Sequence, residues 1–275
     1  MLQVFTENKK VLFLSLLSSV VFIYLAYFLD RSHFYELIGC FGICFGIYIY
    51  SVKKATTNAL SLFLGLGILF RLLFLFSTPT LSDDYFRFIW DGQLILNSIN
   101  PFDLLPTQVG IDLPNKADLL AGMNSPNYYT VYPPIAQSIY FLSAWLSPNS
   151  ILGSIVVMRS IILATEIGTL LLLPKLLSKL NLNPKQSLWY VLNPLVIVEL
   201  TGNLHFEGIV IFFFVLAVYL LMLQKEKLSS IAWAFAAATK LIPIFFLPII
   251  LRKLPFKKAF FFYLLFGISF LILWL

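Results

Sequence analysis

Residues that could do chemistry gather in one polar interval of an otherwise apolar chain, from Ser77 to about Pro134. Six of the chain's 13 acidic residues lie in it: Asp83, Asp84, Asp91, Asp103, Asp112 and Asp118. Asp83 and Asp84 come shortly after an apolar run, so we expect them at a membrane surface. A carboxylate in an aqueous cleft there can stay ionised and still reach a hydroxyl group, as a general base must.

The same acidic pair also has a structural interpretation. From Asp84 onward the residue pattern predicts an interfacial helix, with Asp91 on the same side as Asp84. Ser82 or Asp83 would then cap that helix, where acidic residues complement the helix dipole. Because adjacent carboxylates point in different directions on a helix, we expect one to act and the other to cap or orient. Three apolar side chains of this helix are expected to face lipid: Phe86, Ile89 and Trp90.

A second group of ionisable residues interrupts the apolar segments. Arg71 lies near the end of an apolar run, His205 and Glu207 share a short turn, and Lys240 lies in the middle of another run. Ionisable groups inside membrane segments are costly and are candidates for function. The basic residues suit a phosphate, and Glu207 suits a hydroxyl group. A histidine in a turn can also be structural, and an arginine can extend to the lipid headgroups.

A membrane domain must position these residues. Of the 275 residues, 60% are hydrophobic and 12% are charged, where a soluble domain has about 25% charged residues. At about 20 apolar residues per crossing, the chain has material for seven or eight membrane helices. This composition excludes a soluble enzyme, a disordered tail and a nucleic-acid-binding protein. The net charge of +6 comes from Lys and Arg residues scattered between apolar segments.

Apolar runs predict the membrane helices. The long runs are Val11–Leu29, Phe34–Ser51, Leu60–Phe76, Ile151–Leu173, Ser187–Leu200, Gly208–Leu223, Ser229–Leu251 and Ala259–Leu275. The shorter run Ile135–Leu146 is expected to lie at the outer interface. Ser229–Leu251 is expected to break into two half-segments near Lys240, which Pro243 follows. The predicted fold is an all-α polytopic transmembrane helical bundle with a large external loop that carries interfacial helices.

The positions of Lys and Arg predict the orientation. With a cytoplasmic N-terminus, 13 of the 19 Lys and Arg residues are cytoplasmic and the acid-rich interval is external. The first ten residues and the run after them resemble a signal peptide. No small-residue cleavage site follows, so we expect a retained membrane anchor.

Motifs for several other chemistries are missing from the sequence. It has no Walker loop, no GxGxxG, no HExxH, no Cys/His metal cluster and no nucleophile elbow. We therefore expect neither a metal nor a cofactor. A transporter or flippase for a lipid-linked or small anionic substrate is the alternative class, because broken helices and intramembrane charges also mark transport pathways. That alternative predicts internal repeats and acidic residues at midplane depth, whereas here the acidic residues crowd one loop.

Seven short motifs occur in a characteristic order. They are Leu81-Ser82-Asp83-Asp84-Tyr85, Trp90-Asp91-Gly92, Asn100-Pro101-Phe102, Tyr132-Pro133-Pro134, Asn193-Pro194-Leu195, Gly202-Asn203-Leu204-His205-Phe206-Glu207 and Thr239-Lys240-Leu241-Ile242-Pro243. Together they resemble the GT-C superfamily of polytopic glycosyltransferases, especially bacterial mannosyltransferase-like proteins that use a polyprenyl-phosphate sugar. The likeness runs from about Leu60 to Leu251.

The resemblance implies roles for particular residues. The catalytic base is expected in the first large external loop, where Asp83 matches best and Asp84 is the second choice. The donor phosphate is expected on three basic residues: Lys240, Arg71 and His205. Three further residues are expected to bind the substrate or acceptor: Asp91, for which a structural role is the alternative, Glu207 and Tyr132. Glu207 departs from the family pattern, in which an Asp often follows the His.

The resemblance also implies a reaction and a domain organisation. A sugar, mannose by resemblance, would pass from polyprenyl phosphate to a hydroxyl of a glycan or glycolipid acceptor by an inverting single displacement. The site would lie on the external face of the bacterial cytoplasmic membrane. We expect one transmembrane catalytic module made of N-terminal helices (1–58), the helix leading to the loop (59–76), the external loop (77–150) and further membrane helices (151–275). Because enzymes of this superfamily usually have more helices, we expect the natural chain to continue past Leu275.

Overall fold

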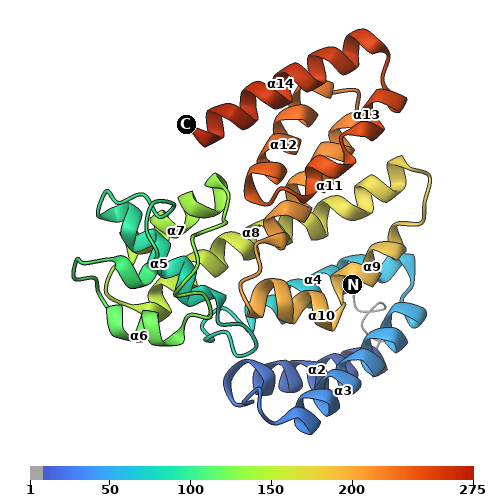
Figure 1. Cartoon of the computed structure of the whole chain (residues 1–275). Coiled ribbons are helices and arrows are strands. Elements are labelled where there is room, and N and C mark those ends of the chain that lie inside the picture. The colour runs from blue at the N-terminus through green and yellow to red at the C-terminus, as the bar shows by residue number, and fades with distance from the viewer. Residues whose placement is uncertain (1–8) are drawn as a thin grey trace. The chain divides into compact units, whose positions relative to one another are not determined.

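The computed structural model describes residues 9–275, and the regular elements in this range are all helices (Figure 1). The predicted fold class, an all-α polytopic helical bundle, is confirmed. The start of the predicted N-terminal anchor falls on residues 1–8, outside the described residues. The chain divides into two compact units, which we describe separately: Met1–Ser82 with Leu170–His205, and Asp83–Thr169 with Phe206–Leu275.

The first unit contains the helices near the N-terminus and a later group of short helices. Helices α2 (Lys9–Tyr27) and α3 (Phe34–Lys54) lie side by side, and α4 (Leu60–Leu72) follows them. Two very short helices, α9 (Leu188–Val191) and α10 (Pro194–Val196), lead into a π-helical turn, Ile197–Gly202. Aromatic side chains fill the core, where the rings of Phe22 and Phe70 lie 5.1 Å apart.

The second unit contains the elements of the acid-rich interval and the C-terminal helices. The acid-rich interval forms α5 (Asp84–Leu96), α6 (Lys116–Gly122) and α7 (Pro134–Leu146). The C-terminal helices are α11 (Glu207–Met222), α12 (Glu226–Thr239), α13 (Pro248–Lys253) and α14 (Phe256–Trp274). The long helix α8 (Ile151–Lys179) contributes residues to both units.

Helix α5 is buried on nearly every side, and one prediction about it is wrong. Ile89 and Trp90, which were expected to face lipid, are 1% and 0% exposed. Helix α7 packs closely against α5 at Gly92, where an added Cβ would lie 2.2 Å from the carbonyl oxygen of Tyr140. The apolar pattern therefore serves contact between helices of the protein, and α5 does not present those side chains to a membrane.

Helices α11 and α12 form an antiparallel hairpin whose free ends meet. The chain turns at Leu223–Lys225, so the start of α11 comes back beside the end of α12. Helix α12 ends at Thr239, and Lys240 has an extended backbone before a 3₁₀ turn, Ile242–Phe246. The predicted break near Lys240 is confirmed. The indole of Trp233 fixes this turn, since its Nε1 donates to the carbonyl of Pro243 at 2.9 Å.

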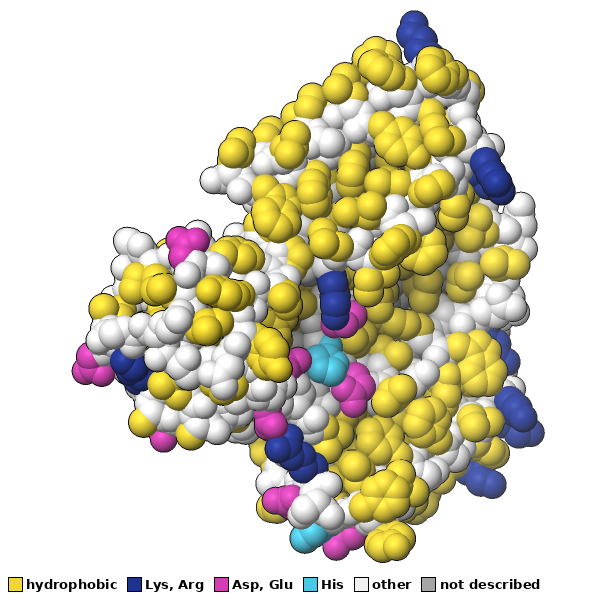
Figure 2. Space-filling view, in the orientation of Figure 1, with side chains coloured by type: hydrophobic (Ala, Val, Ile, Leu, Met, Phe, Trp, Pro, Cys, Tyr) yellow, Lys and Arg dark blue, Asp and Glu magenta, His cyan; other side chains and the backbone are white. Residues whose placement is uncertain are grey.

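Fewer helices than predicted are long and apolar enough to cross a membrane. Among the described residues these are α2, α3, α8 and α14, with a fifth span if Pro194–Gly202 and Glu207–Met222 cross together. The predicted runs at Leu60–Phe76 and Ser187–Leu200 give a 13-residue helix and a series of short turns. Helix α14 exposes large apolar side chains along its length, and hydrophobic side chains cover this part of the surface (Figure 2).

Candidate active site

The acidic pair lies at the start of α5, in the second unit. Asp83 occupies the N-cap position, yet its side chain makes no capping hydrogen bond, and both carboxylates are half-buried. Asp84, the first residue of the helix, accepts a hydrogen bond at Oδ1 from the Asn124 side-chain amide at 3.0 Å. Asp84 is therefore tied to the segment between α6 and α7.

One turn further along α5, a buried ion pair joins Arg87 to Asp91. The Arg87 Nε lies 2.8 Å from Asp91 Oδ1, and the two side chains are 2% and 0% exposed. Their spacing of four residues places them on the same face of the helix. Arg87 also donates through Nη1 to the carbonyl oxygens of Ser125 and Tyr128, at 3.1 and 2.8 Å. The pair thus binds α5 to the backbone of the segment that precedes α7.

The second carboxylate oxygen of Asp91 accepts two more hydrogen bonds. The donors are the Thr130 hydroxyl and the Gln137 amide, the latter at 3.0 Å. Burial raises the pKa of Asp91, while Arg87 and the two hydrogen bonds act against that rise. Because Asp91 is wholly buried and uses both oxygens inside the protein, its geometry suits the structural role that was expected as one alternative.

Tyr132 lies in an aromatic cluster close to the acidic residues. Its ring packs edge-on against Phe88 at 5.0 Å and against Tyr140 at 5.6 Å. Phe206, directly before Glu207, packs on the same cluster through Phe88 at 5.3 Å. Burial raises the pKa of the Tyr132 phenol, and the nearby carboxylates of Asp84, Asp91 and Glu207 raise it further. The phenol is therefore a protonated hydrogen-bond donor within electrostatic range of the acidic residues.

An ion pair closes the open end of the α11–α12 hairpin. Glu207 is the first residue of α11, Lys240 follows the last residue of α12, and the ammonium of Lys240 contacts Glu207 Oε1. The Lys240 and Glu207 side chains are 47% and 38% exposed, so both are open to solvent or a ligand. The break after Thr239 is what places this cation at the hairpin end, where an anionic group can approach it.

Comparison with protein families decides the identity of the chain. A family model described as "Alpha-(1->6)-mannopyranosyltransferase, N-terminal domain" matches residues 31–254. The chain belongs to this family. It is thus a membrane glycosyltransferase of the mannosyltransferase kind, and the predicted resemblance is confirmed. No match was found among curated proteins or among solved structures.

The mannosyltransferase family match includes all eight predicted site residues, which are distributed over the two units. The second unit holds six of them: Asp83, Asp84, Asp91, Tyr132, Glu207 and Lys240. The first unit holds Arg71 and His205. Roles in catalysis and binding stay predictions for all eight.

Arg71 is a buried anchor of the first unit of this mannosyltransferase. Its Nη1 donates to the carbonyl oxygens of Gly67 and Val191, at 3.0 and 2.8 Å. Gly67 makes the close approach of α4 and α9 feasible, because an added Cβ would lie 2.5 Å from a methyl group of Val191. These contacts explain why an arginine is tolerated at a fully buried position.

His205 follows a strained turn and pairs with an acidic residue. Its Nδ1 lies 3.2 Å from Glu199 Oε2, and each side chain is about one-third exposed. Leu204 has a φ of +58°, which is unusual for a leucine. Asn203 Oδ1 accepts a hydrogen bond from the backbone N–H of Leu81 at 3.3 Å, two residues before Asp83. Strained backbone and π-helical turns are frequent at functional sites.

Several residues of the site were not singled out from the sequence. Asn124, Thr130 and Gln137 contact Asp84 or Asp91, but they belong to a segment without periodicity or to a different helix. Arg87 could have been found, since Arg and Asp four residues apart on a predicted helix form a known pairing. Within residues 9–275 no three His, Cys, Asp or Glu side chains gather as a metal site would require.

Proposed function

We propose that this domain transfers a mannosyl residue from a polyprenyl-phosphate donor to a hydroxyl of a glycan or glycolipid acceptor. The enzyme is then of the GT-C type, and its site faces the outside of the bacterial cytoplasmic membrane. The family match over residues 31–254 carries this proposal, because it covers all the motifs that the transfer scheme uses.

The proposed reaction is a single displacement with Asp83 as general base. Asp83 takes the proton of the acceptor hydroxyl, and the oxygen attacks the anomeric carbon from the face opposite the phosphate. The bond from that carbon to the phosphate oxygen breaks, so the anomeric configuration inverts and polyprenyl phosphate leaves. The position of the pair supports this assignment, since Asp83 is half-buried at the start of α5 and the neighbouring Asp84 is held by the Asn124 amide.

Lys240 is the proposed partner of the leaving phosphate. Negative charge accumulates on that phosphate in the transition state, and a fixed cation there lowers the barrier. Lys240 belongs to the same unit as Asp83, is about half-exposed, and is held in place by Glu207. Arg71 and His205 belong to the first unit, and a phosphate-binding role for them stays a prediction of the resemblance.

Tyr132 is proposed as a hydrogen-bond donor to the sugar or to the acceptor. Its raised pKa keeps the phenol protonated, and its ring is fixed by Phe88 and Tyr140. The buried Arg87–Asp91 pair positions the segment that carries this tyrosine, because it holds the backbone at Ser125 and Tyr128.

Reconstituted transfer tests the donor class. The chain, in proteoliposomes, is given either a polyprenyl-phosphate mannose or a nucleoside-diphosphate mannose together with a mannoside acceptor. We expect product only from the lipid-linked donor. Product from the nucleotide sugar would contradict the proposed donor, and movement of the intact lipid-linked sugar across the bilayer without product would support the transporter alternative.

A further inference from the structure

Basic residues gather where α13 ends and α14 begins, in the second unit. Arg252 and Lys253 are the last two residues of α13, and Lys257 and Lys258 lie in the first turn of α14. We call Arg252, Lys253, Lys257 and Lys258 together the basic corner. All four side chains are exposed, and no acidic residue occurs between them in the chain. No step of the proposed transfer reaction uses these residues.

The backbone of the basic corner is held firmly by its apolar neighbours. Ile250 and Ala259, which flank it, are each 1% exposed and belong to one apolar core. The Tyr263 hydroxyl of α14 donates to the carbonyl oxygen of Leu247, directly before α13, at 2.7 Å. The fold therefore keeps the four positive charges close together, and they cannot separate to reduce their repulsion.

The protein neutralises only part of this charge within the described residues. Lys258 Nζ lies 2.6 Å from Glu226 Oε1, at the start of α12. Among residues 9–275 no acidic side chain forms an ion pair with Arg252, Lys253 or Lys257. Lys257 also lies at a helix N-terminus, where the helix dipole is already positive. An anion bound at this surface would relieve the remaining repulsion.

Exposed apolar side chains accompany the charges. Leu251, Phe256 and Phe260 are 61%, 85% and 56% exposed, and Phe256 directly precedes Lys257. They lead into α14, which is long and apolar enough to cross a membrane and belongs to a surface rich in hydrophobic side chains (Figure 2). Basic residues at the end of such a helix lie at the depth of the lipid headgroups, with apolar neighbours toward the acyl chains. A soluble polyanion would cover the charges and leave these apolar side chains in water.

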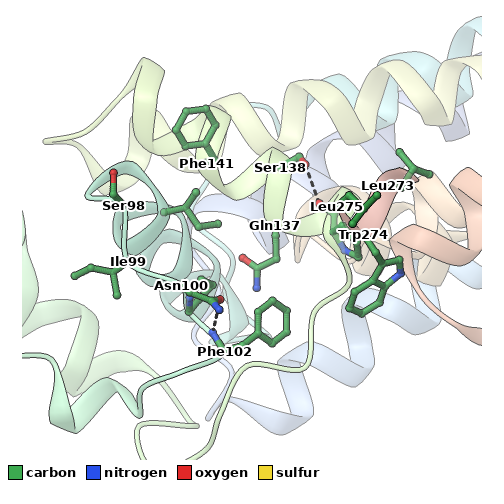
Figure 3. A pocket seen from close by; sticks show the side chains of 13 residues that line it. Ser98, Ile99, Asn100, Phe102, Gln137, Ser138, Phe141, Leu273, Trp274 and Leu275 are labelled. Carbon is green, nitrogen blue, oxygen red and sulfur yellow. Dashed lines mark hydrogen bonds between the residues drawn. The ribbon is translucent and has the colours of Figure 1, made fainter. Parts of the chain in front are cut away.

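A cavity of about 480 Å³ in the same unit offers no alternative place for an anion (Figure 3). Its wall includes the opposite end of α14, together with residues of α5 and α7. None of the residues that line it has a charged side chain. An anionic headgroup would lose its hydration there without gaining a counter-charge.

We propose that the basic corner binds the headgroup of an anionic phospholipid, such as phosphatidylglycerol, at the membrane surface. The lipid phosphate lies among Arg252, Lys253 and Lys257, and the acyl chains lie beside Phe256 and α14. The predicted orientation places the corner on the cytoplasmic side, where the leaflet carries negative charge. The proposal does not depend on the transfer reaction, since it concerns other residues and a binding event alone.

Lipid binding to the purified chain tests the proposal. Native mass spectrometry in detergent gives Kd values for phosphatidylglycerol and for phosphatidylcholine, which has no net charge. We expect wild type to prefer phosphatidylglycerol, and Lys253→Gln combined with Lys257→Gln to weaken phosphatidylglycerol binding about 10- to 30-fold. Phosphatidylcholine binding should stay unchanged. Lys253→Arg combined with Lys257→Arg keeps both charges and should bind phosphatidylglycerol as wild type does.

Lys53→Gln combined with Lys54→Gln is the matched control. These lysines are exposed at the end of α3, another helix long enough to span, and their replacement removes the same charge. We expect a phosphatidylglycerol Kd near that of wild type. Equal weakening by the two glutamine double variants would overturn the proposal, because the attraction would then follow the net charge of the chain. An unchanged Kd after the Lys253 and Lys257 substitutions would also overturn it, as would tighter binding of poly-glutamate than of phosphatidylglycerol at the corner.

Discussion

Asp91 accepts hydrogen bonds from three side chains that come from three places in the second unit. Arg87 lies on the same helix, Thr130 in the segment before α7, and Gln137 on α7 itself. Since Arg87 also holds two backbone carbonyls of that segment, the Arg87–Asp91 pair determines where Tyr132 lies relative to α5. We therefore propose that Asp91 has a positioning role rather than direct contact with the acceptor.

Asp91→Asn is expected to destabilise the second unit strongly. The substitution leaves the buried Arg87 guanidinium without its counter-charge, which costs about 3–5 kcal/mol in comparable buried pairs. The midpoint of thermal unfolding in detergent should fall by about 10 °C. Asp112→Asn, at an exposed position of the same unit, is the control and should leave the midpoint unchanged. An Asp91→Asn protein with the wild-type midpoint would show that the pair does not hold the unit together.

Lys240→Ala is expected to slow transfer about 10²–10³-fold in kcat, because it removes a charge that stabilises the leaving phosphate. Lys240→Arg should recover part of the activity, since it keeps the cation. Lys227→Ala, in the first turn of the same helix, is the control and should behave as wild type. If Lys240→Ala changed only the KM of the acceptor, the assignment to the donor phosphate would have to be abandoned.

At the scale of elements, local signals predicted the break at Lys240 and the short helix α7. A proline three residues after a lysine within an apolar run marks the break, and the 13 residues of α7 are too few to cross a bilayer. The lipid-facing side predicted for α5 was wrong. Periodicity identifies the apolar face of a helix. It does not say whether lipid or protein covers that face, and Ile89 and Trp90 are buried inside the protein.

Gly92→Ala is expected to separate α5 from α7. The added methyl group would meet the backbone of Tyr140, which cannot move aside as a flexible side chain can. Overpacking of this kind costs about 1–3 kcal/mol or more, so the unfolding midpoint and transfer activity should both fall. Gly267→Ala, in α14 of the same unit, is the matched control because nothing lies within 4 Å of the new methyl group. Equal midpoints for the two variants would contradict the close helix contact.

For the whole molecule, composition predicted a membrane protein correctly but overestimated the number of long spans. An apolar run predicts that its side chains avoid water. Contact with other helices achieves this as well as contact with lipid. Asn193-Pro194 and Lys240 break two of the predicted runs into short pieces. The hydrogen bonds to Asp84 and Asp91 were beyond prediction for a related reason. Asn124 and Thr130 lie in an irregular segment, and only the tertiary fold brings them to α5.

The predicted orientation is tested by cysteine labelling in intact cells. Cys40 and Cys44 are first replaced by alanine, and single cysteines are then introduced at Asp112 and at Lys227. We expect a membrane-impermeant maleimide to label position 112 from outside, because the acid-rich segment is external by the distribution of Lys and Arg. Position 227 should react only after permeabilisation. The reverse pattern would contradict the external site.

The central claim is that Asp83 is the base of a mannosyl transfer from a lipid-linked donor. It is tested most directly by the kcat of Asp83→Asn and Asp84→Asn, measured with saturating polyprenyl-phosphate mannose. Asp83→Asn should lower kcat by about 10²–10⁴-fold with donor binding near wild type, because an amide cannot take the proton. Asp84→Asn should be much milder, since its side-chain oxygen can still accept the hydrogen bond of Asn124. Near wild-type transfer by Asp83→Asn would contradict the claim.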